Sequence, residues 1–368
     1  CAMRQKQQKA ILIDLVHPKV SASHAKDRMV EFEELISTLG GIEVVEAMQS
    51  RAQPHPKTFL GKGKIEDLGP HAEELEATVL VINASLKSRQ IYELGEALRE
   101  HGIQVWDRLD LILKIFAKHA STTEAQLEIE LASIKHMGPR IFGMGMELSR
   151  QGGGVGTRGL GETNIERMKR HLKEKERKIK KKLETYQKGR ALVRKGRERR
   201  GLKTVSIVGY TNAGKTTLLN KLTGRKEYVA NELFATLDTR VGELWLPNKR
   251  KSVLLADTIG FIKELPPELL NAFASTLSEA VEADLLIHVT DASDEHLLDH
   301  VDVVEDILKS LGIHETPRML VMNKIDQISD AKKKAIINAF PKKNLVWISA
   351  SEDLGLEGLI ERIEEEIG

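Results

Sequence analysis

The amino-acid sequence predicts an α/β protein with three successive parts. These are an N-terminal parallel α/β domain (residues 1–108), a long antiparallel helical hairpin (109–200) and a C-terminal P-loop domain (201–368). Three observations predict this fold class. Apolar runs alternate with helical stretches at both ends of the chain, apolar residues recur at three- and four-residue steps between them, and a phosphate-binding sequence follows an apolar run at Gly209.

The composition is typical of a globular protein without a membrane span. Hydrophobic residues make up 41% and charged residues 30% of the chain, and there is no apolar run of about 18 residues. One cysteine excludes an internal disulfide framework and fits a reducing compartment, so we expect a cytoplasmic protein. The aromatic content of 4% argues against stacking of nucleic-acid bases as a main mode of binding.

Four short apolar or β-branched runs predict the strands of the N-terminal domain, at Ala10–Val16, Ile42–Ala47, Val79–Ile82 and Ile103–Trp106. Helices are expected between them at 26–38, 64–76 and 88–100. Gly61-Lys62-Gly63-Lys64 lies just before the second helix, but it has neither P-loop spacing nor a strand directly before it, so we favour a loop and helix cap over a phosphate site. Residues 1–108 show no catalytic cluster and are interpreted as a binding or scaffolding module.

The hairpin is predicted from two apolar stripes. Leu109 to Glu147 is helical in pattern, with the stripe Leu127, Leu131, Ile134 and Met137. A second helix carries Ile165, Met168, Leu172, Ile179, Leu183, Tyr186 and Val193. The glycine-rich stretch from Ser149 to Glu162 joins them. We favour a recognition loop over a disordered linker, because glycine beside arginine suits close approach to a phosphate backbone. Its candidate contacts are Arg150, Gln151, Gly152, Gly153, Gly154, Thr157, Arg158 and Gly159.

The second helix of the hairpin is strongly basic. Between residues 167 and 200, only Glu174, Glu176, Glu184 and Glu198 oppose a long run of lysines and arginines. A solvated helix face usually mixes the two signs more evenly, so the excess favours a nucleic-acid surface, although charge does not distinguish RNA from DNA. A solvated coiled coil is the alternative. The candidate contacts here are Lys173, Arg177, Lys180 and Lys181.

The P-loop is the G-x-x-x-x-G-K-T sequence between Gly209 and Thr216. It follows the apolar run Val205–Val208 and opens into a helical stretch, Thr217–Leu222, which is the context that the motif requires. Backbone N–H groups of such a loop point at one anion, and the helix N-terminus adds to the field. Lys215 would reach the β- and γ-phosphates, and Thr216 would bind Mg²⁺. The candidate phosphate contacts are Gly209, Tyr210, Thr211, Asn212, Ala213, Gly214, Lys215, Thr216 and Thr217.

Further P-loop elements follow in order. A strand is expected to reach Leu246, and others at Val253–Ala256, Leu285–Val289, Met319–Met322 and Leu345–Ile348 are expected to be buried. Asp257-Thr258-Ile259-Gly260 ends one of them. Asp257 would hold Mg²⁺ through water, and Gly260 would offer its N–H to a γ-phosphate. The polar connection Phe234-Ala235-Thr236-Leu237-Asp238 would place Thr236 over the metal and the γ-phosphate, as a nucleotide-dependent switch.

Residues at two strand ends predict which base the nucleotide carries. Asp326, in Asn323-Lys324-Ile325-Asp326, offers two carboxylate oxygens that match the adjacent N1–H and N2–H₂ donors of guanine, which adenine lacks. Asn323 would tie this loop to the P-loop. In Ser349-Ala350-Ser351, the Ala350 N–H would meet the guanine O6 acceptor. The sequence therefore predicts a site for GTP or GDP with Mg²⁺, in which Lys215, Thr236 and Gly260 serve catalysis.

These residues resemble a translation-type small GTPase domain, and nearly the whole chain resembles the HflX family. The segments that carry the resemblance are Leu60–Lys64, Val105–Arg108, Ile112–Phe116, Gln151–Gly154, Thr157–Gly159, Gly161–Glu162 and Phe234–Asp238. The resemblance implies a bacterial-type cytosolic P-loop GTPase that binds the large ribosomal subunit and its ribosomal RNA, and that splits or rescues stalled ribosomes. It also implies that the glycine-rich loop approaches the peptidyl-transferase region.

One position departs from Ras-like enzymes. Phe261 follows Gly260 where those enzymes have a glutamine that orients the attacking water, and the HflX family shares this feature. We therefore expect a monomeric GTP hydrolase that is slow without its ribosomal partner. A ribosome-assembly GTPase is one alternative. A nucleic-acid-remodelling ATPase is another, against which the guanine-selective Asp326 argues.

Overall fold

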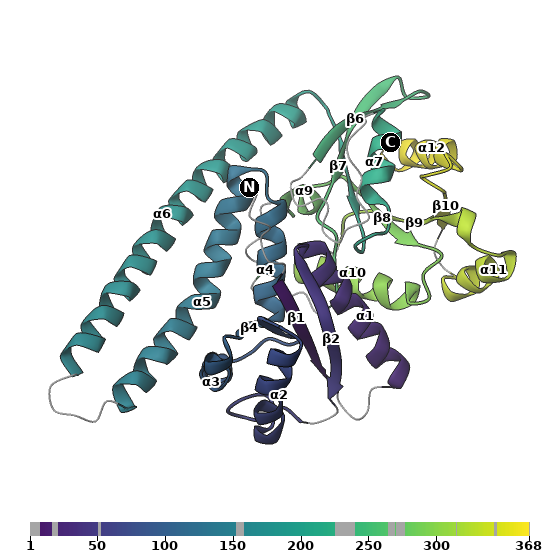
Figure 1. Cartoon of the computed structure of the whole chain (residues 1–368). Helices are drawn as coiled ribbons and strands as arrows, with labels where there is room; N and C mark the ends of the chain where they lie inside the picture. Colours follow the sequence, from purple (N-terminus) through teal and green to yellow (C-terminus); the bar gives the residue numbers. More distant parts are fainter. Residues whose placement is uncertain are drawn as a thin grey trace, which may run out of the picture. The chain divides into compact units, whose positions relative to one another are not determined.

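The computed structural model divides the chain into two compact units (Figure 1). The first consists of residues 1–118 and 127–183, and the second of residues 119–126 and 184–368. The structure describes residues 8–16, 21–50, 53–151, 158–224, 240–263, 269, 277–313, 315–341 and 344–367. For residues 49–50, 139, 141–151, 158–165 and 278–279 within these ranges, the structure describes the backbone alone.

The first unit contains a four-stranded parallel sheet of order β2-β1-β3-β4. The strands are β1 (Gln8–Leu15), β2 (Ile42–Ser50), β3 (Val79–Ile82) and β4 (Gln104–Asp107). The predicted parallel α/β domain is confirmed, and each strand overlaps its expected range. The pairing of β1 with β2 shifts register once, between Ala10 and Ile11.

Four helices follow the strands of this sheet: α1 (Ala22–Leu39), α2 (Lys62–Glu74), α3 (Ser88–Ala97) and α4 (Arg108–His119), with a 3₁₀ turn η1 at Arg99–His101. Gly61 is the N-cap of α2, which confirms the interpretation of Gly61–Lys64 as a loop and helix start. Leu68 and Leu94, from α2 and α3, pack with Ile11 and Ile13 of β1 on one face of the sheet. Ala10 and Leu12, which alternate with them, are also buried.

The first expected hairpin helix is in fact two helices. α4 ends at His119, and α5 (Thr123–Gln151) starts after a short break, where Thr122 Oγ1 accepts a hydrogen bond of 3.2 Å from Ala125 N–H. A Thr or Ser hydroxyl that accepts a bond from the N–H three residues later is a helix N-cap, so Thr122 caps α5. The Ser121-Thr122 pair before Glu124 was the sequence signal of this start.

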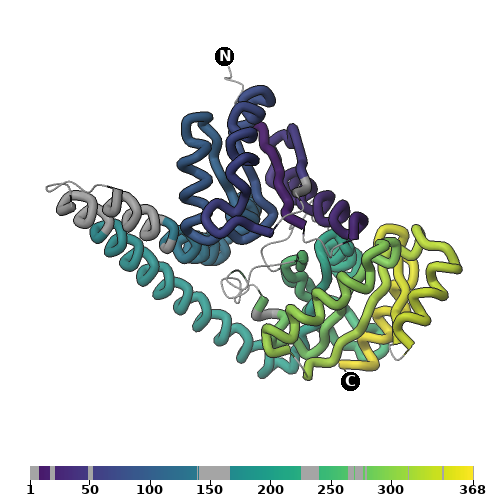
Figure 2. Tube along the Cα trace, turned by 90° about the horizontal axis from the view of Figure 1, so that it is seen from below, coloured from purple at the N-terminus to yellow at the C-terminus, as the bar shows by residue number. Residues whose placement is uncertain are grey.

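The second helix, α6 (Arg158–Arg199), is 42 residues long and continuous (Figure 2). The predicted loop was too long, because α5 extends through Gln151 and α6 already includes Arg158 to Glu162. Only residues 152–157 lie between the two helices, and they are outside the described residues.

The apolar contact between α5 and α6 is shorter than the stripes predicted. Leu127 and Leu131 pack with Ile179 and Leu183, and the partly buried Ile134 joins them. Beyond this cluster the prediction was wrong for four side chains, since Met137, Met168, Tyr186 and Val193 are exposed. The periodicity marks a face on which a helix is able to pack, but it does not show how far the opposite helix supplies apolar partners.

The second unit contains a six-stranded sheet of order β10-β9-β8-β5-β7-β6, in which only β6 is antiparallel to its neighbour. Its strands are β5 (Thr204–Val208), β6 (Arg240–Leu246), β7 (Lys251–Asp257), β8 (Leu285–Asp291), β9 (Arg318–Asn323) and β10 (Leu345–Trp347). The expectation that the last strand is buried was wrong: β10 is an edge strand, and all its residues are half-buried.

Helices cover both faces of this sheet. They are α7 (Lys215–Thr223), α9 (Ser278–Val281), α10 (Leu297–Ser310), α11 (Asp330–Ala339) and α12 (Leu356–Ile367), with a 3₁₀ turn η2 at Ile325–Gln327. Leu218 of α7 and Leu359 of α12 pack with Val321 of β9. Val301 of α10 packs with Leu320, on the opposite face. Among the described helices, none combines the length and the apolar character needed to cross a bilayer.

Candidate functional site

Polar residues of the second unit gather where its parallel strands end. Gly209 follows β5, Asp257 ends β7, and Asn323 ends β9. Because parallel strands present their carboxyl ends at one edge of the sheet, these residues lie at the same edge. β5 lies between β7 and β8, and β9 is next to β8. The P-loop therefore starts at the centre of the sheet.

The two P-loop glycines are needed for close contacts. A Cβ atom on Gly209 would lie 2.2 Å from the carbonyl oxygen of Val289. A Cβ on Gly214 would lie 2.3 Å from Asn323 Nδ2, and Gly214 also has a φ of +91°. Gly214 is the N-cap of α7, which begins at Lys215. The loop thus leads into a helix N-terminus, which is the arrangement that binds phosphate groups.

Lys215 is held inside the P-loop. Its Nζ donates a hydrogen bond of 2.8 Å to the carbonyl oxygen of Tyr210, and the side chain is buried. Burial lowers the pKa of Lys215 from 10.5 to about 8, while the negative charge of Asp257 opposes this shift. A Cβ on Gly260 would lie 3.0 Å from Lys215 Nζ, so Gly260 and Lys215 face the same space.

Thr216 and Asp257 meet directly. Thr216 Oγ1 donates to Asp257 Oδ2 at 2.8 Å, and Asp257 is fully buried. The next residue, Thr258, donates from Oγ1 to the carbonyl oxygen of Ile207 at 2.8 Å, which fixes the segment to β5. Ile259 is buried as well. A hydroxyl and a carboxylate brought together in this way are oxygen ligands of the kind that Mg²⁺ prefers.

The Asn323–Asp326 loop is joined to the P-loop by Asn323. Its Nδ2 donates to the carbonyl oxygen of Ala213 at 2.8 Å. Lys324 has a φ of +62°, and its Nζ lies 2.7 Å from Asp291 Oδ2. These contacts hold the loop, while Asp326 on η2 is exposed and accessible to a base.

Ala350 differs from its expected role. Its N–H, which we expected to be available for a guanine O6 atom, donates to Asn323 Oδ1 at 3.0 Å. A base would have to share or replace this bond. The flanking Ser349 and Ser351 hydroxyl oxygens lie 3.1 Å apart. Ser349 is buried and Ser351 is exposed.

Several predicted residues lie outside the described ranges. They are the switch residues Phe234, Ala235, Thr236, Leu237 and Asp238, and the loop residues Gly152, Gly153, Gly154 and Thr157. The backbones of Arg150, Gln151, Arg158 and Gly159 are helical, but their side chains are not described.

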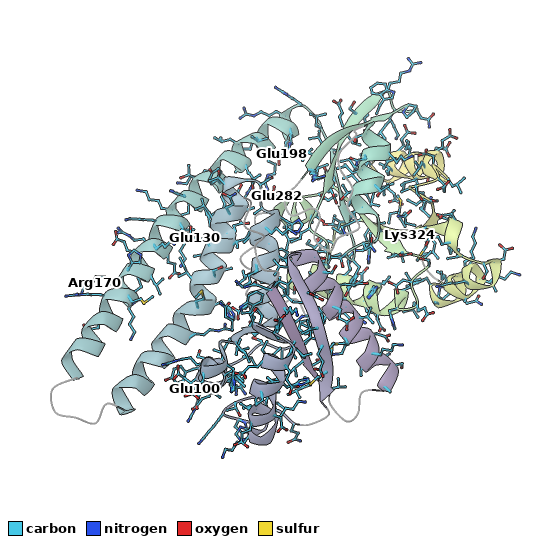
Figure 3. The ribbon with its side chains drawn as sticks, viewed as in Figure 1. Glu100, Glu130, Arg170, Glu198, Glu282 and Lys324 are labelled. Carbon is cyan, nitrogen blue, oxygen red and sulfur yellow. The ribbon has the colours of Figure 1, made fainter. Side chains whose placement is uncertain are left out.

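The basic residues of α6 are exposed but not all unopposed. Lys173 and Arg177 are exposed, as is Arg170, which points outward from the helix (Figure 3). Lys180 is exposed too, although its Nζ lies 2.7 Å from Glu176. Lys181 is exposed as well. Salt bridges within the helix therefore offset part of the basic charge that the sequence indicated.

The C-terminal end of α6 is anchored within the second unit. Arg190 forms an ion pair with Glu124 at the start of α5. Arg194, one helical turn further on, forms an ion pair with Glu282, which directly follows α9 (Figure 3). Both arginines are half-buried, so this end of the helix is fixed at two points.

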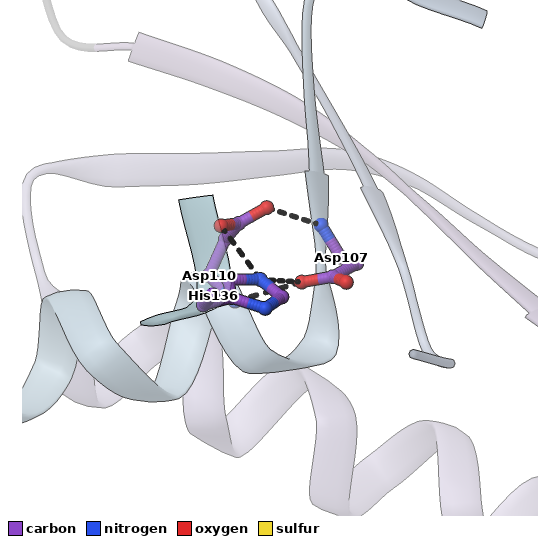
Figure 4. A group of neighbouring side chains, drawn as sticks. All are labelled: Asp107, Asp110 and His136. Carbon is purple, nitrogen blue, oxygen red and sulfur yellow. Dashed lines mark hydrogen bonds and ion pairs between the residues drawn. The ribbon is translucent and has the colours of Figure 1, made fainter. Parts of the chain in front are cut away.

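The structure also brings together a polar cluster that the sequence did not reveal. Asp107 at the end of β4, Asp110 in α4 and His136 in α5 converge in the first unit (Figure 4). His136 Nε2 lies 3.3 Å from Asp107 Oδ1 and 3.2 Å from Asp110 Oδ1. Burial lowers the pKa of His136, but the hydrogen bonds to both aspartates outweigh it and raise that pKa overall.

Arg140 makes this cluster an ion-pair network. It forms ion pairs with Asp107 and, at 2.7 Å, with Asp110. Burial raises the pKa of Asp110, but the His136 hydrogen bond and the Arg140 charge outweigh burial and lower it overall. Two carboxylates, three residues apart and already opposed by a guanidinium and an imidazolium, form an ion-pair network that ties α5 to β4 rather than a metal site.

Comparison with protein families assigns each part of the chain. Residues 26–117 match the model described as "GTP-binding GTPase N-terminal", and residues 119–197 match "GTP-binding GTPase Middle Region". Residues 204–324, which contain the P-loop and the Asn323 loop, match "50S ribosome-binding GTPase".

Individual relatives agree over almost the whole chain. The GTPase HflX of Caldanaerobacter subterraneus is 41% identical over 98% of this chain and 81% of its own length. That of Escherichia coli is 39% identical over 96% of this chain and 82% of its own length. Among solved structures, a complex of SsGBP with GDP has a TM-score of 0.55 at 26% identity, and covers 97% of this chain and 98% of that one.

Proposed function

Since the chain belongs to the HflX family of GTPases, we propose that it binds the large ribosomal subunit and dissociates or rescues stalled ribosomes, with GTP hydrolysis stimulated by the ribosome. One observation carries this proposal: a guanine-nucleotide domain and a 42-residue helix with an exposed basic face form one continuous chain. Such a face suits the phosphate backbone of RNA.

The protein is a GTP hydrolase that binds guanine nucleotide. We assign the phosphates to the backbone N–H groups of Gly209–Thr217 and to the Lys215 ammonium. Lys215 Nζ would exchange its hydrogen bond with the Tyr210 carbonyl oxygen for bonds with the β- and γ-phosphates. Asp326 would accept from the guanine N1–H and N2–H₂ groups. Asn323 holds both loops at their spacing, so it would set the distance between the phosphate and base subsites.

Mg²⁺ fits the Thr216–Asp257 pair. The two oxygens are already adjacent, and Asp257 is a fully buried carboxylate beside a buried lysine. Thr216, Asp257 and the switch residue Thr236 would hold the ion, which supplies charge neutralisation for the developing negative charge on the phosphates. Gly260 would offer its N–H to the γ-phosphate from the opposite side of Lys215.

The side chain of Phe261 cannot orient the attacking water. It is fully buried, and a phenyl ring has no hydrogen-bonding group. The protein alone would therefore bind GTP well and hydrolyse it slowly. A ribosomal subunit would supply or position the group that the attacking water lacks. Completion in trans raises the rate of other GTPases by roughly 10³ to 10⁵, and we expect a smaller gain here because positioning alone does not deliver an arginine.

The test is GTP turnover with and without purified large ribosomal subunits, in the parent protein and in a deletion of residues 152–159. We expect low basal turnover in both proteins and strong stimulation in the parent only. Stimulation that survives the deletion would contradict the role of the loop. A fast basal rate in the parent would contradict the role of Phe261.

A ribosome-assembly role is the alternative within GTPases, and it predicts preference for immature subunits over mature ones. Co-sedimentation with both kinds of subunit, at several salt concentrations and nucleotide states, separates the two roles. We also propose a cytoplasmic monomer, which analytical ultracentrifugation of the purified chain would check.

A further inference from the structure

The segment after Gly260 pairs with the P-loop through a single parallel β-bridge. Phe261 N–H donates to the carbonyl oxygen of Gly209 at 3.1 Å, and Thr211 N–H donates to that of Phe261 at 2.8 Å. Tyr210 and Phe261 are thus partners in a parallel bridge. The Phe261 side chain is fully buried, so the segment is held both by its backbone bonds to the P-loop and by the burial of its side chain.

The Tyr210 side chain adds a contact with Lys263, two residues after Phe261. Its phenolic oxygen accepts a hydrogen bond of 2.8 Å from the Lys263 N–H. The ring is stacked on His300 of α10, with ring centroids 3.7 Å apart and an interplanar angle of 7°. His300 Nδ1 in turn lies 2.9 Å from Asp294 Oδ2. Tyr210 is buried, so α10 fixes the position of its ring.

The backbone of Tyr210 reaches the other side of the site. Its carbonyl oxygen accepts the hydrogen bond from Lys215 Nζ. Gly260 lies between these contacts, since a Cβ there would be 2.8 Å from Thr211 Cγ2 and 3.0 Å from Lys215 Nζ. A shift of the segment after Gly260 would therefore move the Gly260 N–H relative to Lys215.

We propose that Tyr210 is a positioning residue for GTP hydrolysis: its hydroxyl fixes Lys263, and so holds the Gly260 N–H where the γ-phosphate is bound. The inference rests on the proposed assignment of Gly260 to the γ-phosphate. Tyr210 acts through the chain between Gly260 and Lys263 and does not touch the reacting atoms.

The proposal predicts different effects on the affinities for GTP and GDP. GDP lacks the γ-phosphate, so its affinity does not depend on the Gly260 N–H. Tyr210→Phe removes the hydrogen bond from the Lys263 N–H but keeps the ring on His300. It should lower turnover, and the affinity for a non-hydrolysable GTP analogue, by about three- to tenfold, and leave GDP affinity unchanged. His300→Ala, which removes the stacking partner, should act in the same direction.

The experiment measures the ratio of GTP-analogue to GDP affinity, turnover, and hydrogen exchange at the Phe261–Lys263 amides. Tyr186→Phe on α6, where the ring is partly exposed, is the matched control and should be parental. A parental ratio and turnover in Tyr210→Phe would overturn the proposal, and so would an equal loss for GDP, which would point to the P-loop as a whole.

The outcome is distinct from a failure of the proposed function. The affinity ratio and the exchange rates need no turnover and no ribosome, so both are measurable even if the subunits do not stimulate hydrolysis. Gly260→Pro removes the Gly260 N–H, so a variant that binds the GTP analogue as tightly as the parent protein would contradict the assignment of Gly260. Faster exchange at Lys263 with a parental affinity ratio would contradict the role of Tyr210 alone.

Discussion

Asn323 donates a hydrogen bond from its side-chain Nδ2 to the carbonyl oxygen of Ala213 across 2.8 Å, although the two residues lie 110 positions apart. The Oδ1 atom of the same side chain accepts a hydrogen bond from the Ala350 N–H. Asn323→Ala would leave a buried N–H without its partner, at a cost of about 1–3 kcal/mol. If this cost falls on nucleotide binding, we expect GDP affinity to fall by about five- to 150-fold. Gln327→Ala, exposed on η2, is the control, and unchanged GDP binding in Asn323→Ala would contradict this link.

Base selectivity should depend on Asp326. In Asp326→Asn an amide N–H₂ group replaces one carboxylate oxygen, so it meets the N2–H₂ donor of guanine unfavourably and the O2 acceptor of xanthine favourably. Sites that hydrogen-bond their substrate discriminate strongly against a mismatched partner. We expect the preference to move at least about tenfold from GTP toward xanthosine triphosphate. Competition between the two nucleotides measures it, and a variant that keeps the parental preference would show that guanine is bound elsewhere.

Lys215 should make nucleotide affinity pH-dependent. Its pKa in the structure is about 8, whereas bound phosphates would favour the charged form and raise it. Binding then takes up a proton above pH 8, so affinity is highest below this value and falls as pH rises, by up to about tenfold per unit. Calorimetry of GDP binding in buffers of different ionisation enthalpy measures the uptake. Binding that is independent of pH between 7 and 9.5 would contradict the shift.

The His136 network should stabilise the first unit in a defined pH range. Because the pKa of His136 is raised on folding, its contribution is fully present below the unfolded pKa of about 6.5 and is lost as pH rises through the folded value. Since the pKa of Asp110 is lowered, its contribution is lost only in strong acid.

The matching variant is His136→Gln. At pH 6 it should speed hydrogen exchange of the α5 amides near the network by roughly five- to thirtyfold, which corresponds to about 1–2 kcal/mol. The difference from the parent should shrink at pH 9. A difference of the same size at both values would show that the imidazolium charge does not contribute.

The exposed face of α6 should set the salt dependence of RNA binding. Lys173→Glu with Arg177→Glu should weaken binding to ribosomal RNA and reduce the slope of log affinity against log salt by about 2. Lys249→Glu with Lys334→Glu carries the same change of charge on exposed residues outside α6. Equal slopes in the two variants would favour the solvated coiled coil.

The gathering of the nucleotide-site motifs at one edge of the sheet was predictable because each motif is local. Asp257 and Asn323 end their strands and Ser349 comes two residues after one, and parallel strands bring their ends to one edge whatever their sequence separation. The order of the strands and the bond from Ala350 to Asn323 were not predictable in this way. They depend on how closely two loops approach, which residue types do not specify.

The first unit shows the opposite case. His136 reaches Asp107 from a helix 29 residues further on, and no spacing rule connects a lone histidine with two aspartates at a strand end. Helical periodicity likewise predicted burial of Met137 and Met168, which are exposed. A stripe describes one helix, whereas burial depends on both helices.

The unbroken length of α6 has a mechanical consequence. At a rise of 1.5 Å per residue, the helix is about 60 Å long. Two ion pairs one turn apart, Arg190–Glu124 and Arg194–Glu282, hold its C-terminal end, and the helix would pivot about them. A rotation of about 5° there would sweep the Arg158 end through about 5 Å. Because Ile179 and Leu183 of α6 pack on Leu127 and Leu131 of α5, the two helices would move together, and a small angular change near Glu282 would grow into a displacement of several ångströms, roughly in proportion to distance along the helix.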